Sequence, residues 1–238
     1  MNYEEVKKIV TFEKYHFGSD KIWNNLSTDL KKYFLESFRT LHLRKNQIVF
    51  QENGVPTGIY FLKKGKVKKY KNGLNGKEQI FYIGSENELL GYNALLCQEY
   101  YSDTVETLED CEIGFIPKDV FMEIYNSSDE FKNQIIRIMG HEYGVLINHI
   151  TIMAQYNARE RLAIVLLLLK DKYKKNKGEQ SEITISREDL ANLVGTAREN
   201  LIRILNEFKS DNIIETKGKL ILILKPKDLV KISNLSLV

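Results

Sequence analysis

Residues 186–209 restrict the possible folds of this chain more than any other stretch, because they indicate two short helices separated by Gly195. Ser186 can cap the first helix, and Thr196 with Glu199 forms a capping box for the second. The second helix carries an apolar stripe at positions i, i+3, i+4 and i+7, which needs a core to cover it. The stripe consists of Leu201, Ile204, Leu205 and Phe208.

The other side of the second helix is polar. It carries Arg198, Glu199, Asn200, Arg203 and Asn206, whose long side chains suit base edges in a DNA major groove. We therefore interpret the stretch as a helix-turn-helix. Two capped amphipathic helices also occur in helical proteins that never touch DNA, so this stretch alone leaves that alternative open.

The residues that follow favour the DNA-binding interpretation. Two strand-like segments, 213–216 and 220–224, flank the tight turn Lys217-Gly-Lys219. A helix-turn-helix followed by a two-stranded wing is a winged helix. Lys217 and Lys219 would lie where DNA phosphates pass.

The segment 195–205, with the sequence GTARENLIRIL, resembles the recognition helix of the cyclic-AMP receptor protein and fumarate-nitrate regulator (Crp/Fnr) superfamily of bacterial transcription factors. The resemblance extends to the wing tip and, more weakly, back to about residue 41. It implies a homodimer on near-palindromic double-stranded DNA, with RNA polymerase as a further partner.

In the cyclic-AMP receptor branch, an Arg-Glu pair and a second Arg four residues later read the half-site. The resemblance thus assigns base contacts to Arg198, Glu199 and Arg203, the arginines donating to guanine and the glutamate accepting from cytosine. Ile202 stands where the family usually has a small residue, so the full half-site does not follow. The phosphate contacts expected here are Ser186, Arg187, Thr196, Asn200, Lys217 and Lys219.

Charge is divided unevenly along the 238 residues, which are enough for two domains. Residues 157–238 hold 16 Lys and Arg against 11 Asp and Glu, a net +5, whereas the first 156 hold 19 against 21, a net −2. The basic excess lies at the end expected to neutralise phosphates. The longest apolar run, 162–169, is far shorter than the roughly 20 residues that cross a bilayer. With no signal peptide at the N-terminus, a cytoplasmic protein without membrane attachment is expected.

The region from residue 41 to 116 alternates polar and apolar residues with period two. Turn dipeptides such as Asn53-Gly54 separate the segments, so a barrel or jelly roll is predicted. By resemblance, chiefly of residues 58–65, this is a cyclic-nucleotide-binding β-roll, and the fold class is α+β. The predicted strands are 46–51, 58–62, 66–70, 78–83, 104–108 and 111–116.

The resemblance fails where a cyclic nucleotide would be held. Family members that bind one have a Glu after the glycine matching Gly91, and an Arg-Ser pair about ten residues later. Here Tyr92 and Asn93 follow Gly91, no Arg or Lys occurs between Lys77 and Lys118, and Asp103 would repel an anion.

Cyclic AMP is therefore not expected, and the effector is unknown. Because Ser102 and backbone amides could still hold a phosphate, a cyclic-nucleotide-dependent activator stays open as an alternative. The predicted effector pocket consists of Gly91, Tyr92, Asn93, Tyr101 and Ser102.

The chain offers few groups for catalysis or metal binding. Cys97 and Cys111 are its only cysteines, too few for a four-cysteine iron–sulfur cluster. Four scattered histidines form neither a nucleophile–base pair nor a metal site. No enzymatic activity, metal or cofactor is predicted.

A long helix is predicted from about residue 129 to 156. The residues of one mainly apolar stripe follow each other there at alternating spacings of 4 and 3. Such a repeat is typical of a helix that pairs with its own copy. In the family such a helix forms the dimer axis; alternatively it covers its own β-domain. The predicted dimer interface is Phe131, Ile135, Ile138, Glu142, Val145, His149, Ile152 and Tyr156.

Three parts follow from this organisation. Residues 1–128 form the sensor domain with its N-terminal helices, 129–156 the dimerisation helix, and 157–238 the winged helix-turn-helix domain. Residues 157–159 are the expected hinge, and 172–180 form a charged loop.

Overall fold

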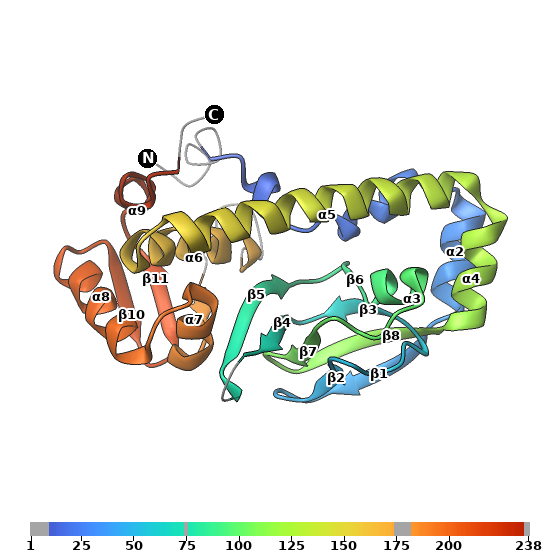
Figure 1. The fold of residues 1–238 in the computed structure, drawn as a ribbon, viewed down its shortest axis with the longest axis horizontal. Helices are drawn as coiled ribbons and strands as arrows, with labels where there is room; N and C mark the ends of the chain where they lie inside the picture. Colours follow the sequence, from blue (N-terminus) through green and yellow to red (C-terminus); the bar gives the residue numbers. More distant parts are fainter. Residues whose placement is uncertain (1–9, 74–75, 174–181, 236–238) are drawn as a thin grey trace. The chain divides into compact units, whose positions relative to one another are not determined.

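The computed structural model describes residues 10–73, 76–173 and 182–235 (Figure 1). Most of the charged loop predicted at 172–180 lies outside these residues. The chain forms two compact units. The first comprises residues 16–71 and 81–145, and the second comprises the described residues within 1–15, 72–80 and 146–238. The three-part division made from the sequence remains a prediction.

Two antiparallel four-stranded sheets form the β-roll, with strand orders β1-β8-β3-β6 and β2-β7-β4-β5. All six strands predicted from the sequence are present. The two additional strands gave little signal, since β1 is exposed along most of its length and β6 has two residues. The strands are β1 (Arg39–Leu43), β2 (Ile48–Phe50), β3 (Gly58–Lys64), β4 (Val67–Asn72), β5 (Glu78–Gly84), β6 (Leu89–Leu90), β7 (Thr104–Thr107) and β8 (Cys111–Pro117).

The β-roll has a closed apolar core. Leu62, Val67, Val105 and Ile113 are fully buried, because alternate residues of each strand point to the same face. Residues on this face lose contact with water, and each contributes about 1.5–3 kcal/mol to folding. The predicted jelly-roll architecture is confirmed.

Helices close one side of the β-roll (Figure 1). Ser27 caps α2, accepting the amide hydrogen of Leu30 at 3.3 Å. Phe34 of α2 and Phe121 of α4 are fully buried in one cluster with Phe131 of α5. The helices up to the end of the long helix are the 3-10 helices η1 (Phe12–Tyr15) and η2 (Ser19–Asn25), followed by α2 (Thr28–Glu36), α3 (Tyr92–Cys97), α4 (Lys118–Ser127) and α5 (Asp129–Gln155).

The predicted dimer stripe of α5 lies largely against its own chain. Phe131, Ile135 and Ile138 belong to the core of their own β-roll unit, as the alternative interpretation held. The remaining members of the stripe are buried or half-buried within the single chain as well: Glu142, Val145, His149, Ile152 and Tyr156. The buried members of this stripe, Phe131, Ile135, Ile138, Val145 and Ile152, leave little surface for a second copy.

A second apolar stripe on α5 faces outward. Ile136, Tyr143, Ile147 and Ile150 are 60%, 68%, 44% and 62% exposed. Their spacings of 7, 4 and 3 place them on one side of the helix. The helix therefore carries two stripes of similar period, and the sequence does not say which of them the rest of the chain covers.

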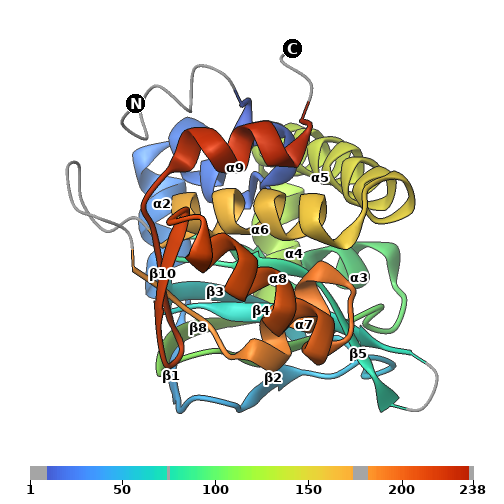
Figure 2. The same cartoon turned by 90° about the vertical axis from the view of Figure 1, so that its left-hand side faces the viewer.

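The helical elements of the second unit surround α6, which lies between α8 and α9 (Figure 2). A capping box of Asn157 and Glu160 starts α6. Neither β9 nor α9 was predicted, because β9 has only three residues and α9 follows directly on the wing. The elements are α6 (Ala158–Lys172), β9 (Glu182–Thr184), α7 (Arg187–Val194), α8 (Arg198–Ser210), β10 (Ile214–Lys217), β11 (Leu220–Ile223) and α9 (Pro226–Ser233).

Strands β10, β11 and β9 form an antiparallel sheet in the order β10-β11-β9. Lys217 pairs with Leu220 across the predicted hairpin, whose Gly218 takes the left-handed conformation with φ of 58°. Among the described residues, no helix is long and apolar enough to span a membrane.

Candidate nucleic-acid interface

Helices α7 and α8 form the predicted helix-turn-helix. The Ser186 hydroxyl accepts the amide hydrogen of Asp189 at 2.9 Å, so the predicted cap of α7 is confirmed. Gly195 ends α7 in the left-handed conformation, with φ of 67°. This residue allows the chain to turn sharply into α8.

The predicted cap of α8 by Thr196 is wrong. The helix begins at Arg198, which makes Ala197 the cap residue, and the Ala197 side chain has no atom that could accept a hydrogen bond. The Thr196 hydroxyl instead accepts a hydrogen bond from the Asn200 amide at 2.8 Å. Because the helix starts one residue later than predicted, Thr196 and Glu199 do not occupy the cap position and the third helical position that a capping box requires.

The two faces of α8 are divided as predicted. Leu201, Ile204, Leu205 and Phe208 are buried, and they pack this helix onto its own unit. Arg198, Glu199 and Arg203 are exposed, as is Ile202 at 38%. The three residues assigned to base contacts therefore share the solvent side of one helix.

Arg203 is held in place along the helix surface. Its guanidinium donates to the Asn200 side-chain oxygen at 2.9 Å and forms an ion pair with Glu207. The Arg203 side chain is nevertheless 65% exposed. An exposed pair at this spacing contributes only about 0.3–0.5 kcal/mol, so a guanine can compete with Glu207 for the guanidinium.

The residues expected at phosphates lie at the edges of α7, α8 and the wing. Arg187 donates to the carbonyl oxygen of Gly218 at 2.8 Å, which fastens α7 to the wing tip. Desolvation lowers the pKa of Arg187, although an arginine remains charged at neutral pH. Lys217 and Lys219 are exposed on either side of Gly218.

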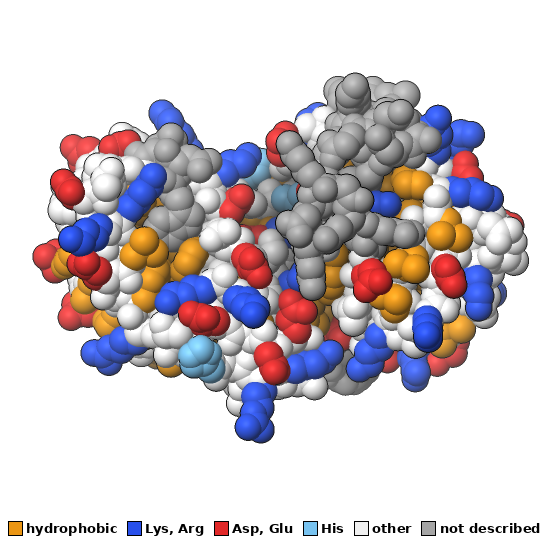
Figure 3. Space-filling view, turned by 180° about the vertical axis from the view of Figure 1, so that it is seen from behind, with side chains coloured by type: hydrophobic (Ala, Val, Ile, Leu, Met, Phe, Trp, Pro, Cys, Tyr) orange, Lys and Arg blue, Asp and Glu red, His pale blue; other side chains and the backbone are white. Residues whose placement is uncertain are grey.

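The Ser186 and Asn200 side chains are already engaged within the protein, Ser186 with Asp189 and Asn200 with Thr196 and Arg203. Figure 3 shows basic and acidic side chains interspersed on the face it draws, with apolar side chains between them. The net charge of the chain is also small, at +3. Any electrostatic attraction to DNA would therefore depend on individual lysine and arginine side chains rather than on the net charge of the protein.

Two family models match the chain at these units. The cyclic nucleotide-binding domain matches residues 40–128, and the Crp-like helix-turn-helix domain matches residues 160–232. The chain belongs to the Crp/Fnr family.

Similar Crp/Fnr proteins include the anaerobic regulatory protein of Aggregatibacter actinomycetemcomitans. It is 26% identical over 196 residues, which cover 81% of this chain and 75% of that protein. The regulatory protein HlyX of Actinobacillus pleuropneumoniae is 28% identical over 185 residues, 76% of each chain. This Crp/Fnr protein is therefore a transcription regulator with a helix-turn-helix DNA-binding domain.

Solved Crp/Fnr structures share the fold. A Crp/Fnr-family regulator from Eubacterium rectale superposes with a TM-score of 0.69 at 23% identity, covering 89% of this chain and 97% of that one. FixK2 from Bradyrhizobium japonicum gives 0.72 at 16% identity, covering 84% and 98%. Both confirm the β-roll, long helix and helix-turn-helix as one fold.

Two of the predicted effector residues of this Crp/Fnr regulator line the same cavity. Tyr101 and Ser102 line an open pocket of about 770 Å³, where Glu52 and Lys71 form an ion pair at 2.9 Å. Tyr101 is buried and stacks on Phe50, with ring centroids 4.0 Å apart. Gly91, Tyr92 and Asn93 do not line this pocket.

Lys69 is a functional candidate that the sequence reasoning missed. The absence of cations between Lys77 and Lys118 holds along the chain, but Lys69 reaches this region because β4 pairs with β7. Its ammonium lies 3.5 Å from Asp103, and both side chains are less than 10% exposed. Only the pairing of strands could have revealed this contact.

Glu142 of α5 belongs to the same polar group. Burial raises its pKa to about 7, while Lys69 and the Tyr92 hydroxyl lower it and Glu88 and Asp103 raise it further. Burial, followed by the charge of Glu142, also raises the pKa of Tyr92 well above its ordinary value. Lys69 therefore faces several carboxylates within this polar group.

Proposed function

We propose that this transcription regulator acts as a homodimer that reads a near-palindromic DNA site through two copies of α8. The observation that carries the proposal is the division of α8 into a buried apolar stripe and an exposed face bearing Arg198, Glu199 and Arg203. Two such helices related by a twofold axis enter successive major grooves about 34–36 Å apart.

The outward stripe of α5 supports the dimer. Ile136, Tyr143, Ile147 and Ile150 expose apolar surface along one side of a 27-residue helix, which is the pattern of a helix that packs against its own copy. This interface replaces the one predicted from the sequence. Burial of these four side chains in a second copy removes them from water.

On DNA, Arg198 and Arg203 donate to guanine O6 and N7, and Glu199 accepts from a cytosine amine. Lys217 and Lys219 contact phosphates on both sides of the wing tip, where their exposure supports the assignment. RNA polymerase is the expected partner of the DNA-bound dimer in the cytoplasm. No catalytic step is assigned to the protein.

The sensor is proposed to act without cyclic AMP. The pairing of Lys69 with Asp103 supports this, because it leaves that ammonium committed to a carboxylate. The match to a cyclic nucleotide-binding domain favours a second candidate, a cyclic-nucleotide-dependent activator. Calorimetric titration with cyclic AMP and cyclic GMP separates the two, since heat of binding at millimolar ligand would support the second.

Selection of bound sequences from random DNA by the purified protein, without added ligand, tests the main proposal. We expect an enriched site made of two inverted half-sites, with guanines opposite the arginines. Sedimentation of the free protein should give the mass of a dimer. Enrichment of an asymmetric single site, or a monomer in solution, would contradict the proposal.

A further inference from the structure

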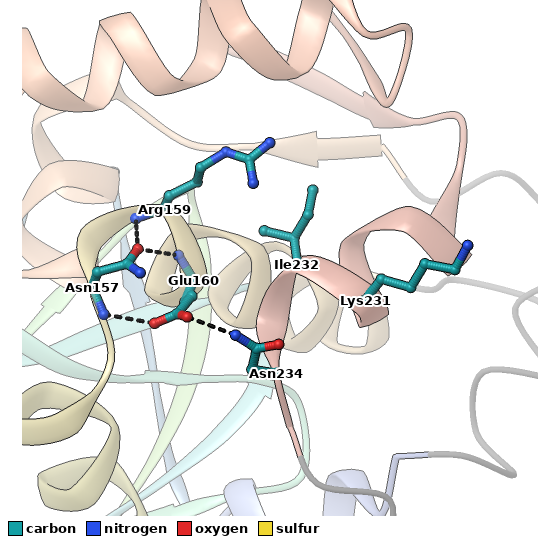
Figure 4. A pocket seen from close by; sticks show the side chains of 6 residues that line it. All are labelled: Asn157, Arg159, Glu160, Lys231, Ile232 and Asn234. Carbon is teal, nitrogen blue, oxygen red and sulfur yellow. Dashed lines mark hydrogen bonds between the residues drawn. The ribbon is translucent and has the colours of Figure 1, made fainter.

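The first turn of α6 connects three other parts of the second unit. Asn157 caps the helix, and Glu160 accepts the Asn157 amide hydrogen at 2.8 Å and the Asn234 side-chain amide at 2.7 Å (Figure 4). The end of α9 is thereby tied to the start of α6, beside a shallow pocket of about 330 Å³.

Arg159 points away from this group of hydrogen bonds (Figure 4). Its guanidinium lies 5.2 Å from the ring centroid of Phe208 and 3.8 Å from a carboxylate oxygen of Glu207. Both partners are in the last half of α8. The first turn of α6 thus also touches the far end of the helix proposed to read DNA.

Arg161 makes the third connection, and it uses three separate nitrogen atoms. Its Nη1 donates to the carbonyl oxygen of Tyr156 at 2.6 Å, its Nε to that of Val194 at 2.8 Å, and its Nη2 to that of Gly195 at 3.0 Å. Tyr156 directly follows α5, whereas Val194 and Gly195 form the end of α7.

These carbonyl groups lie where helices leave acceptors without intrahelical partners. The last four carbonyls of any α-helix lack such a partner, and they carry the negative end of the helix dipole. A cation that caps two helix ends satisfies both at once, and charge-assisted bonds are the stronger kind. The planar guanidinium fixes the relative directions of its donors, so the two helix ends are also held at a fixed mutual angle.

Gly195 stands directly before the residues that lead into α8, so its position decides where α8 begins. We propose that Arg161 is a positioning residue that sets the orientation of the helix-turn-helix against the end of α5, and thereby the distance between the two α8 helices of a DNA-bound dimer. This inference rests on the proposed function, because it requires a dimer joined along α5.

The spacing of the two half-sites reports this role directly. A merely structural contribution to the turn would weaken binding to every DNA by the same factor. A positioning role leaves each α8 able to read its half-site but relaxes the distance between the two. The ratio of affinities for full and half sites, and the preferred spacer length, therefore distinguish the two roles.

The experiment uses the full-length dimer and palindromes built from the selected half-site, with the spacer changed one base pair at a time. A further DNA carries one intact and one scrambled half-site. Arg161→Met keeps most of the side-chain length and removes the donors, whereas Arg161→Lys keeps the charge without the planar fork. Lys227→Met, which removes an exposed cation of α9, is the matched control.

For Arg161→Met we expect binding to the best palindrome to weaken about tenfold, a typical coupling between sites, with little change for the single half-site. Its spacer preference should broaden or move, Arg161→Lys should lie between it and the unaltered protein, and Lys227→Met should keep the original preference. Equal weakening on full and half sites with an unchanged spacer preference would overturn the role of Arg161. Failure of the unaltered protein to prefer any spacer would overturn the proposed function and this inference together.

Discussion

Helices α8 and α5 each carry apolar residues at helical spacing, but the two helices differ in the number of apolar stripes. Helix α8 has 13 residues and one apolar stripe, so the opposite side had to face solvent. Helix α5 has 27 residues and two stripes. One of them covers its own β-roll through residues such as Ile138, and the other leaves Tyr143 and Ile150 exposed.

The difference teaches that an apolar stripe predicts burial without naming what covers it. A helix with two partners needs two stripes, and both satisfy the same periodicity. Exposure in the folded chain separates them, because the stripe used inside the monomer is already covered. Substitutions on the inward side of α5 should therefore change the free energy of unfolding, whereas substitutions on the outward side should change the dimer dissociation constant.

The largest effect is expected on the inward side of α5. Phe131→Ala removes a fully buried ring and should lower the free energy of unfolding by about 3–5 kcal/mol. Tyr143→Ala, its counterpart on the outward side, should alter the stability of the separated chain by less than about 1 kcal/mol. Urea unfolding at protein concentrations below the dimer dissociation constant measures both. Similar losses at both positions would remove the distinction between the two sides.

Dimerisation should respond to the outward side alone. Ile150→Asp places an unpaired charge in the proposed interface, a change that costs about 3–5 kcal/mol and raises the dimer dissociation constant more than about a hundredfold. Thr151→Asp adds the same charge at an exposed position about 100° further round the helix. Analytical ultracentrifugation should show dissociation only for Ile150→Asp; an unchanged dimer would show that α5 pairs elsewhere.

The exposed face of α8 should show smaller effects that depend on DNA sequence. Arg198→Ala should weaken binding by about 1–3 kcal/mol and relax base choice at one position of each half-site. Lys217→Ala should weaken binding to all sequences alike and reduce its salt dependence. Titrations against single-base variants at several salt concentrations test both. A uniform loss for Arg198→Ala would mean that it contacts phosphate.

The smallest effect concerns Glu142 on the inward side of α5. Burial raises its pKa from the ordinary value of 4.5 to about 7, so the folded chain favours the protonated form. The resulting stability is complete below about pH 4.5 and is lost as the pH rises through 7. Allowing for partial exposure, the loss amounts to about 1–2 kcal/mol.

Glu142→Gln should remove this part of the pH dependence, because the amide does not titrate. Unfolding by urea between pH 5 and pH 8 measures the slope for both proteins. Asp119→Asn, at an exposed position in the first turn of α4, serves as the reference for a lost surface carboxylate. Parallel slopes for Glu142→Gln and the unaltered protein would show that Glu142 is ionised throughout.

Much of the fold could be predicted from the sequence, because helix caps and alternating strands depend on residues that are close together along the chain. Ser186 caps the helix predicted for it, and the strands with alternating polar and apolar residues have their predicted places. Thr196 failed as a cap because a shift of one residue in the helix start moves every capping position. Boundaries at this precision depend on the packing of the whole unit rather than on a few residues.

The contacts inside the sensor domain could not be predicted from the sequence, because they join residues that are far apart along the chain. Asp103 was judged by its neighbours in sequence, but Lys69 approaches it through the pairing of β4 with β7. Arg161 likewise gave no sequence signal, since its three carbonyl partners lie before and after it by up to 34 positions. Contacts that depend on which elements meet cannot be read from spacing alone.

The hydrogen bond between Asn234 and Glu160 joins the end of α9 to the first turn of α6. A truncation that removes the last turn of α9 would remove this hydrogen bond to Glu160 but would keep every side chain proposed to contact DNA. A premature stop codon within α9 would therefore be expected to disturb how the regulator responds rather than which DNA sequence it reads.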